Sequence, residues 1–269
     1  MEDKIVAGYL RDFVEDYGLE TLKEPEAFEH FFNYCVVTTH VPSTFPIDDV
    51  HTGKDGNPGI DGLAIVINEH LVNSAEEVDF FAKHSGRLDV RFVFLQSKTG
   101  TKFDMGEIAN FVFAVKDFFA ATPTYTSNDK MNQLRDLKNH IYEKHSIRME
   151  TNPAALLYYA TTGKWENHPT LRSRIDTEIG DISALSLFSE VKFIPYDSDK
   201  IRNLYRELKH KAVKGINLDK HTILPAIEHV QEAYIGILPC KEYLKLISDD
   251  QGNMQKGLFY DNVRDFQGF

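Results

Sequence analysis

The chain has 269 residues, of which 42% are hydrophobic and 12% aromatic, and its formal net charge is −11 at pH 7. This length suits one large domain or two small ones, and the composition supplies a sizeable hydrophobic core. The acidic balance counts against a broad basic surface that wraps nucleic acid, but it allows a small site whose positive charge comes from metal ions.

The N-terminal residues and the hydropathy pattern predict a cytoplasmic protein. The sequence has no apolar run of the roughly 20 residues that a membrane-spanning helix needs. Its first residues, MEDKIVAGYLRDF, are charged and have a helical pattern, which a signal peptide does not. Cys35 and Cys240 both lie among apolar residues, so we expect two buried free thiols in preference to a disulfide.

The first half of the chain alternates predicted helices and strands. Pro25 favours the first turn of a helix, and Ser74 followed by Glu77 has the spacing of a capping box. Residues 41–60 are rich in Pro, Gly, Asp and Thr, which predicts a loop. The periodicity predicts helices at 3–17, 25–37, 74–83 and 105–120, and strands at 61–68 and 90–97.

The second half continues this α/β alternation as far as residue 209. We expect helices at 129–145, 168–179 and 198–209, and strands at 154–161 and 191–196. The remainder, 219–269, has the pattern of helices with breaks. The sequence turns basic and irregular near residue 210, so we expect one domain at 1–210 and a helical extension at 211–269.

Polar residues stand at the ends of two predicted strands. Asp61 opens the first strand, and Gln96 and Lys98 close the second, on the same strand face as Phe92 and Phe94. If the two strands are antiparallel neighbours, the three polar residues meet at one edge of the sheet. If they are parallel, a strand length of roughly 20 Å separates them. The residues alone leave both arrangements open.

Such a cluster has a chemical use. Asp61 and the carbonyl after Gln96 offer the hard oxygen ligands that Mg²⁺ prefers, and Lys98 would stabilise charge that develops on a phosphate. Each residue also has an ordinary structural role open to it. Asp61 could cap a glycine-rich turn, Gln96 could bond to an edge strand, and Lys98 could point to solvent.

Three segments carry a resemblance to known nucleases. The order GIDG followed by FLQSK resembles the PD-(D/E)XK nuclease superfamily in its Mrr-like form, in which Gln replaces an acidic residue of the last motif. Over about residues 26–269, the segments GIDGLAIVIN, LDVRFVFLQSKTGTKFDMGEIANF and LFYDNVRDFQG are similar to the abortive-infection phage-resistance (AIPR) family.

The resemblance implies a fold, a site and an activity. The fold is a restriction-endonuclease-like mixed sheet flanked by helices, in which the two site strands are antiparallel. The superfamily carries a Glu on a preceding helix, which matches Glu29 in EAFEHFF, with Glu26 as the second choice. The implied catalytic residues are then Asp61, Gln96, Lys98 and Glu29, with Asp61, Gln96 and Glu29 as ligands of Mg²⁺ or Mn²⁺.

We therefore expect a metal-dependent nuclease that acts in bacterial defence against phage. The alternative is a nuclease-fold module with weak or no catalysis that binds nucleic acid or a protein. Expected partners are nucleic acid, DNA ahead of RNA, and a second copy of the chain, with no membrane. The family continues beyond the NVRDFQGF motif, so we expect a further domain and an uncovered apolar series at residues 259, 263, 266 and 269.

Histidines outside this cluster carry weaker signals. His140 and His145 in HIYEKH are five residues apart, about 140° around a helix, so they should not share a face as in a zinc helix. We expect a solvated face there. His40 and His51 flank the loop before Asp61, where nothing in the spacing demands a role for them.

Overall fold

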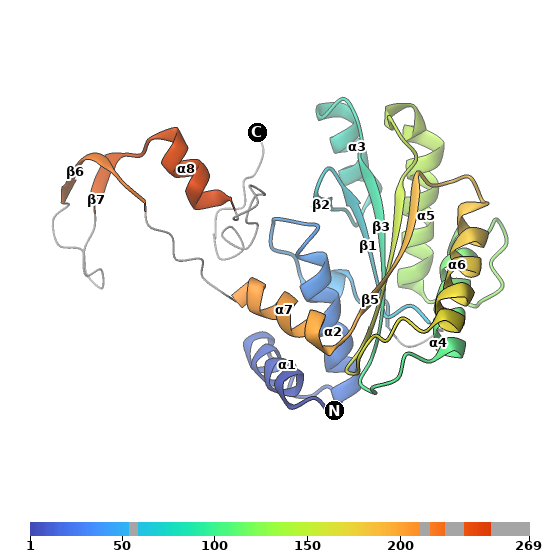
Figure 1. Ribbon diagram of the computed structural model, residues 1–269. Helices are drawn as coiled ribbons and strands as arrows, with labels where there is room; N and C mark the ends of the chain where they lie inside the picture. Colours follow the sequence, from blue (N-terminus) through green and yellow to red (C-terminus); the bar gives the residue numbers. More distant parts are fainter. Residues whose placement is uncertain (54–58, 210–215, 224–233, 249–269) are drawn as a thin grey trace. The chain divides into compact units, whose positions relative to one another are not determined.

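A five-stranded sheet with the strand order β2-β1-β3-β4-β5 forms the centre of the computed structural model (Figure 1). Strand β1 is antiparallel to both β2 and β3, whereas β3, β4 and β5 run parallel to one another. The strands are β1 (Gly62–Ile67), β2 (His70–Leu71), β3 (Val90–Lys98), β4 (Ala154–Thr161) and β5 (Glu190–Tyr196).

The chain divides into two units, Met1–Leu208 and Lys209–Phe269, and the sheet belongs to the first. The structure describes residues 1–53, 59–209, 216–223 and 234–248. Within those residues no helix combines the length and the apolar character that crossing a membrane requires.

Seven α-helices are described in the first unit, and their ends follow from local sequence signals. Asp3 and Asp104 accept hydrogen bonds from backbone amides at the starts of α1 and α4, and Ser74 forms a complete capping box with Glu77. The helices are α1 (Lys4–Tyr17), α2 (Glu24–Val37), α3 (Ala75–His84), α4 (Met105–Phe119), α5 (Asp129–His145), α6 (Pro169–Ser183) and α7 (Ser198–Lys209).

Helices cover both faces of the sheet, and the strands are therefore apolar on both faces. Phe92 and Phe94 of β3 pack in a core with residues of α3, α4, α5 and α6. Val93 and Leu95, which alternate with them, pack in a second core with α1, α2 and α7. Burial on both faces explains why β3 is a nearly continuous apolar run until Gln96.

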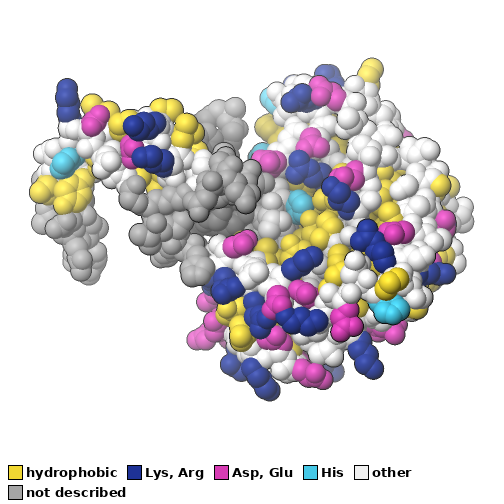
Figure 2. All heavy atoms as spheres, viewed as in Figure 1, with side chains coloured by type: hydrophobic (Ala, Val, Ile, Leu, Met, Phe, Trp, Pro, Cys, Tyr) yellow, Lys and Arg dark blue, Asp and Glu magenta, His cyan; other side chains and the backbone are white. Residues whose placement is uncertain are grey.

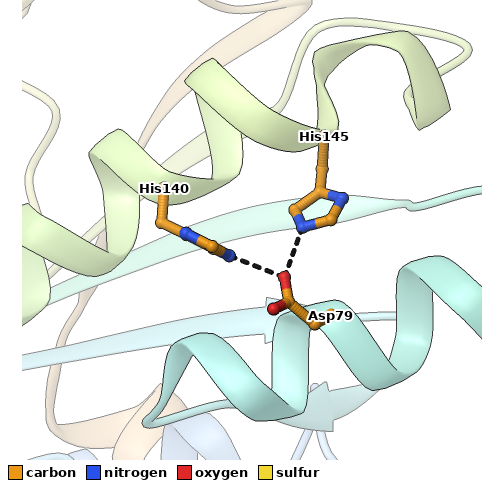
Figure 3. Close-up of side chains that lie close together, drawn as sticks. All are labelled: Asp79, His140 and His145. Carbon is orange, nitrogen blue, oxygen red and sulfur yellow. Dashed lines mark hydrogen bonds and ion pairs between the residues drawn. The ribbon is translucent and has the colours of Figure 1, made fainter.

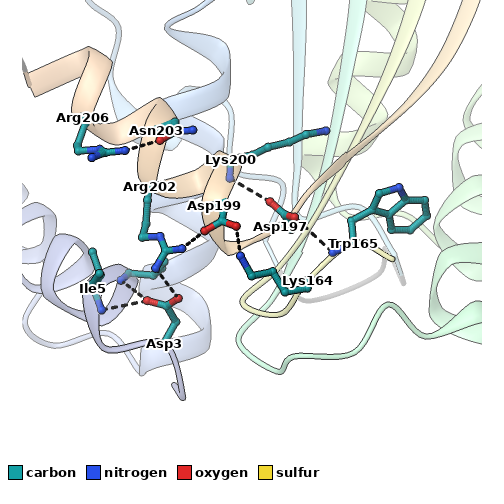
Figure 4. A network of polar contacts seen from close by, with 11 residues as sticks. Asp3, Ile5, Lys164, Trp165, Asp197, Asp199, Lys200, Arg202, Asn203 and Arg206 are labelled. Carbon is teal, nitrogen blue, oxygen red and sulfur yellow. Dashed lines mark hydrogen bonds and ion pairs between the residues drawn. The ribbon is translucent and has the colours of Figure 1, made fainter. Parts of the chain in front are cut away.

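Ion pairs connect the start of α1 to α7 and to the loop after β4 (Figure 4). Asp3 caps α1 and also accepts from Arg202 of α7, with 3.4 Å between Oδ2 and the guanidinium nitrogen. Asp199 pairs with both Arg202 and Lys164, the latter in the loop that follows β4. The first and last helices of this unit are thus tied together at one end of the sheet.

The expected elements agree closely with those observed in the first unit. The mixed α/β sheet flanked by helices is confirmed, and the antiparallel pairing of the first two expected strands is observed as β1 with β3. Strand β2 was not expected, and α6 extends to Ser183, beyond the expected end at residue 179. Cys35 is buried and forms no disulfide, as expected.

The second unit corrects two expectations. Its described residues contain an antiparallel pair, β6 (Asp219–Ile223) and β7 (Tyr234–Ile237), before the short helix α8 (Cys240–Ile247), so it is not purely helical. The pair includes β-branched and aromatic residues such as Thr222, Ile223 and Tyr234, which favour strands. Cys240 is exposed, not buried. The expected apolar series at 259–269 lies outside the described residues.

Candidate functional site

Asp61 lies directly before β1 and is fixed to the end of β3. Its backbone N–H donates to the carbonyl of Leu95 at 2.9 Å, and its side-chain Oδ2 accepts from the backbone N–H of Ser97 at 2.7 Å. Its own carbonyl accepts from Asn33 Nδ2 of α2 at 3.1 Å. The antiparallel register of β1 and β3 therefore brings Asp61 beside the QSK segment. Of the two strand arrangements that the sequence left open, this is the one in which the polar residues meet.

Gln96 and Lys98 lie on the same face of β3 as Phe92 and Phe94, the face covered by α4. Gln96 is only 4% exposed, and its Oε1 has no hydrogen-bond partner among the described residues. Lys98 is half-buried, and its positive charge acts on the Asp61 carboxylate. A buried amide oxygen without a partner is costly and calls for a ligand.

Glu29 of α2 faces the interior of the site. Its side chain is 14% exposed, and its Oε2 lies 3.1 Å from Nε2 of His51. Glu29 is therefore not a solvated carboxylate of the helix surface. Its charge acts on Asp61, so the two carboxylates share one electrostatic environment. The charge of Glu26, the second choice from the sequence, acts on the neighbouring His30.

The electrostatics of the site centre on Asp61. Although the residue as a whole is half-buried, its carboxyl lies among protein atoms. Burial raises the pKa of Asp61 to about 7, with a further increase from the nearby negative charge of Glu29. The hydrogen bond from Ser97 and the charges of Lys98 and His51 act in the opposite direction and only partly offset this.

Three residues around Asp61 were not predicted as site residues. His51 bonds to Glu29, and its ring lies against that of His30 with 4.1 Å between centroids. Burial and the neighbouring His51 lower the pKa of His30 below its ordinary value. Asn33 approaches so closely that a Cβ on Gly62 would lie 2.5 Å from its side chain. His51 was noted only for its place beside the loop, and no spacing signal singled out His30 or Asn33.

The arrangement suits a divalent cation bound by oxygen. Asp61 and Glu29 supply two carboxylates that repel each other, and Gln96 supplies an amide oxygen without a partner. A cation bound between them would remove the repulsion and satisfy the amide. Mg²⁺ and Mn²⁺ prefer such hard oxygen ligands. The donor types therefore match the ion that the resemblance implies, and its binding at these residues stays a prediction.

A hollow of about 700 Å³ lies among the loops that follow β3 and β4. Its lining includes Lys102, Phe103, Lys164, Trp165 and His168. The loop after β3 begins directly after Lys98, so the residues that line the hollow follow the Asp61 cluster closely along the chain. The lining is mixed in charge, because Asp104 and Glu166 stand beside the two lysines, and its aromatic side chains are of the kind on which bases stack in nucleic-acid grooves.

The surface charge is mixed. Figure 2 shows Lys and Arg side chains interspersed with Asp and Glu over the face of the first unit turned toward the viewer. This agrees with the net charge of −11 and with the absence of a broad basic surface on this face. Any attraction of this face for a polyanion must therefore be local.

The comparisons with known proteins give no match. No family model matches the chain, and neither does any curated protein or any solved structure. The geometry of the site is accordingly the basis for any functional proposal.

The two histidines of HIYEKH overturn the expectation of a solvated face. His140 and His145 both reach Asp79 of α3, with Nε2 to Oδ1 distances of 2.7 and 2.6 Å (Figure 3). The 140° separation assumes a regular helix, but His145 ends α5 with φ −123° and ψ 7°. The His145 side chain therefore does not follow the regular spacing of the helix. Asp79 of α3 lies between the two rings and bonds to both.

Proposed function

We propose that the protein is a metal-dependent nuclease that hydrolyses phosphodiester bonds with Mg²⁺ or Mn²⁺. The observation that carries this proposal is the placement of Asp61, whose carboxyl accepts from Ser97 beside Lys98 and lies near the Glu29 carboxylate. A half-buried pair of carboxylates next to a lysine at the end of two antiparallel strands is costly to the fold, which favours a functional reason for it.

Each residue has a role that follows from its position. A bound Mg²⁺ or Mn²⁺ supplies a water of lowered pKa and screens the phosphate charge. Asp61, Glu29 and Gln96 hold the ion by their side-chain oxygens. Lys98 stabilises the negative charge that builds up on the phosphate during attack. His51 fixes the orientation of Glu29, and Asn33 fixes the backbone of Asp61.

The substrate, setting and ancestry belong to the same proposal. The GIDG and QSK segments support a restriction-endonuclease-like fold. The similarity of GIDGLAIVIN, LDVRFVFLQSKTGTKFDMGEIANF and LFYDNVRDFQG to the AIPR family supports a role in abortive infection within the cytoplasm. Phe103 and Trp165 in the hollow after β3 and β4 support nucleic acid as the substrate, because bases stack on aromatic side chains, with DNA ahead of RNA. A second copy of the chain remains the proposed protein partner.

A second candidate is a binding module of the same fold without effective catalysis. Gln96 favours this candidate, because a neutral amide binds Mg²⁺ more weakly than the carboxylate that other members of the superfamily carry. The net charge of −11 favours it also, since it weakens attraction to a polyanion. The two candidates differ in whether phosphodiester bonds break.

The experiment is a cleavage assay on plasmid DNA, single-stranded DNA and RNA with Mg²⁺, Mn²⁺ or a chelator. Wild-type protein is compared with Lys98→Met and with a control, Lys116→Met, which replaces a half-buried lysine of α4 that pairs with Asp181. We expect metal-dependent cleavage that Lys98→Met reduces and the control retains. Binding of nucleic acid without cleavage in any metal would establish the module, and equal activity of Lys98→Met would remove the assigned site.

A further inference from the structure

A second group of metal-ligating side chains lies outside the Asp61 cluster. Asp79 of α3 and the two histidines His140 and His145 of α5 place one carboxylate oxygen and two ring nitrogens within 4.8 Å of one another. Figure 3 shows both rings directed from α5 toward the same Asp79 oxygen. We propose that these three residues form a Zn²⁺ site that links α3 to α5.

The donor set selects the ion. Two imidazole nitrogens and one carboxylate oxygen are typical ligands of Zn²⁺, whereas Mg²⁺ prefers oxygen donors in a near-octahedral shell. Three protein ligands leave the fourth tetrahedral position to water. This site therefore differs in chemistry from the oxygen-rich cluster around Asp61, and the two should take different ions.

The distances require only a small adjustment. In a tetrahedral zinc site with bonds of 2.0–2.1 Å, neighbouring ligand atoms lie about 3.3 Å apart. The two nitrogen–oxygen distances of 2.7 and 2.6 Å would each open by somewhat more than half an ångström. The Asp79 side chain is 55% exposed on α3, so it is free to make this movement. The two rings already lie close, with 5.2 Å between centroids.

The surroundings hold the histidines in place more firmly than an accidental surface contact would. Their side chains are only 24% and 16% exposed, because both pack in the contact between α3 and α5. Both ring nitrogens lie within hydrogen-bond distance of the same Asp79 oxygen. A single cation could therefore take the place of the two hydrogen bonds, with the two ring nitrogens and the carboxylate oxygen as its ligands.

The position gives such a site a structural consequence. Helix α3 precedes β3 and helix α5 precedes β4, and β3 and β4 are neighbours in the sheet. An ion between α3 and α5 would therefore link the two helices that lead into these strands. Both helices pack on the same face of the sheet. A ligand that binds only the folded state raises its stability with the logarithm of the ratio of ligand concentration to Kd. At a hundredfold excess over Kd, Tm should rise by roughly 5–10 °C for a domain of this size.

The test uses the full chain without an affinity tag, freed of metal by a chelator. Zn²⁺ is titrated by calorimetry, and Co²⁺ is added as a spectroscopic probe, to wild-type protein and to His140→Gln, His145→Gln and Asp79→Asn. The matched control is His84→Gln, an exposed histidine of α3 whose Nδ1 bonds to the Phe80 carbonyl. Asp61→Asn reports separately whether ions bind at the other cluster.

We expect one Zn²⁺ per chain, with affinity lowered at least tenfold in each of the three variants and kept in His84→Gln and Asp61→Asn. The Co²⁺ spectrum should be that of a four- or five-coordinate site without a thiolate band, which excludes Cys35 and Cys240 as ligands. Unchanged Zn²⁺ affinity in the His140→Gln and His145→Gln variants would overturn the proposal.

A second measurement covers the case in which a variant does not fold. X-ray absorption of the zinc-loaded wild-type protein counts the ligands directly and needs no substitution. Two imidazoles with oxygen ligands are expected. A shell with sulfur, with oxygen alone, or with one imidazole would refute the site, whatever the outcome at Asp61.

Discussion

Replacement of Asp61 by Asn should stabilise the metal-free protein at high pH while it abolishes metal binding. The structure raises the pKa of Asp61 from its ordinary 3.8 to about 7. The folded state therefore retains a proton that the unfolded chain releases, and stability is lost as pH rises from about 4 to about 7. At 1.36 kcal/mol per pKa unit, ionisation of Asp61 costs the fold about 4 kcal/mol above that window.

This value is an upper limit, because Asp61 is half-buried and solvent screens part of the repulsion. Asn keeps the shape and an oxygen that accepts from Ser97, and it carries no charge. If half of the limit is realised, about 2 kcal/mol, Tm of Asp61→Asn should exceed that of the wild type by roughly 4–8 °C at pH 8. The difference should shrink steadily as the pH is lowered toward 4.

The assay is thermal unfolding from pH 4 to pH 9 with a chelator, and again with Mn²⁺. Asp12→Asn, an exposed position on α1, is the matched control and should follow the wild type at every pH. Mn²⁺ should raise Tm of the wild type and leave Asp61→Asn unchanged. If Asp61→Asn is less stable than the wild type at pH 8 without metal, the carboxylate is a structural cap and the electrostatic reasoning is refuted.

Three further substitutions test the other residues of the cluster. Lys98→Met should leave Mn²⁺ affinity intact and lower the cleavage rate by about 10²–10³-fold, the scale for one lost electrostatic stabiliser. Calorimetry measures the affinity and single-turnover kinetics the rate, and a loss of Mn²⁺ binding would contradict the assigned role. Gln96→Glu should tighten Mn²⁺ binding and keep or raise activity, since it supplies a third carboxylate; weaker binding in calorimetry would show that Gln96 is not a ligand. Glu29→Gln should lower the pKa of Asp61, because it removes a like charge; the carboxyl ¹³C titration measures this, and an unchanged midpoint would place Glu29 too far away to act.

The strands and helices of the first unit were predictable because each signal is local. The capping box at Ser74 and Glu77 and the alternation in β1 and β3 need no knowledge of distant residues. The pairing of β1 with β3 was different. The helix α3 lies between the two strands, so the residues left parallel and antiparallel pairing open, and only the resemblance to nucleases favoured the observed arrangement.

The parts of the site that escaped prediction depend on tertiary contacts. His51 belongs to the site because it bonds to Glu29 of α2. Asn33 can approach Asp61 because Gly62 has no side chain. His140 and His145 were set aside as a metal pair because they do not share a face of a regular helix. In the structure His145 leaves the helical conformation, and the third side chain of the group, Asp79, comes from α3. The strands of the second unit escaped because they are only five and four residues long, too short for their periodicity to distinguish a strand from a helix.

The most direct test of the central claim is anomalous diffraction from crystals of the protein soaked in Mn²⁺ at pH 8, above the pKa of Asp61. The account predicts a Mn²⁺ peak bonded to a carboxylate oxygen of Asp61, with Glu29 and the Gln96 amide oxygen completing the protein ligands. A peak only at Asp79, or a well-ordered Asp61 side chain with no ion beside it at saturating Mn²⁺, would contradict the account.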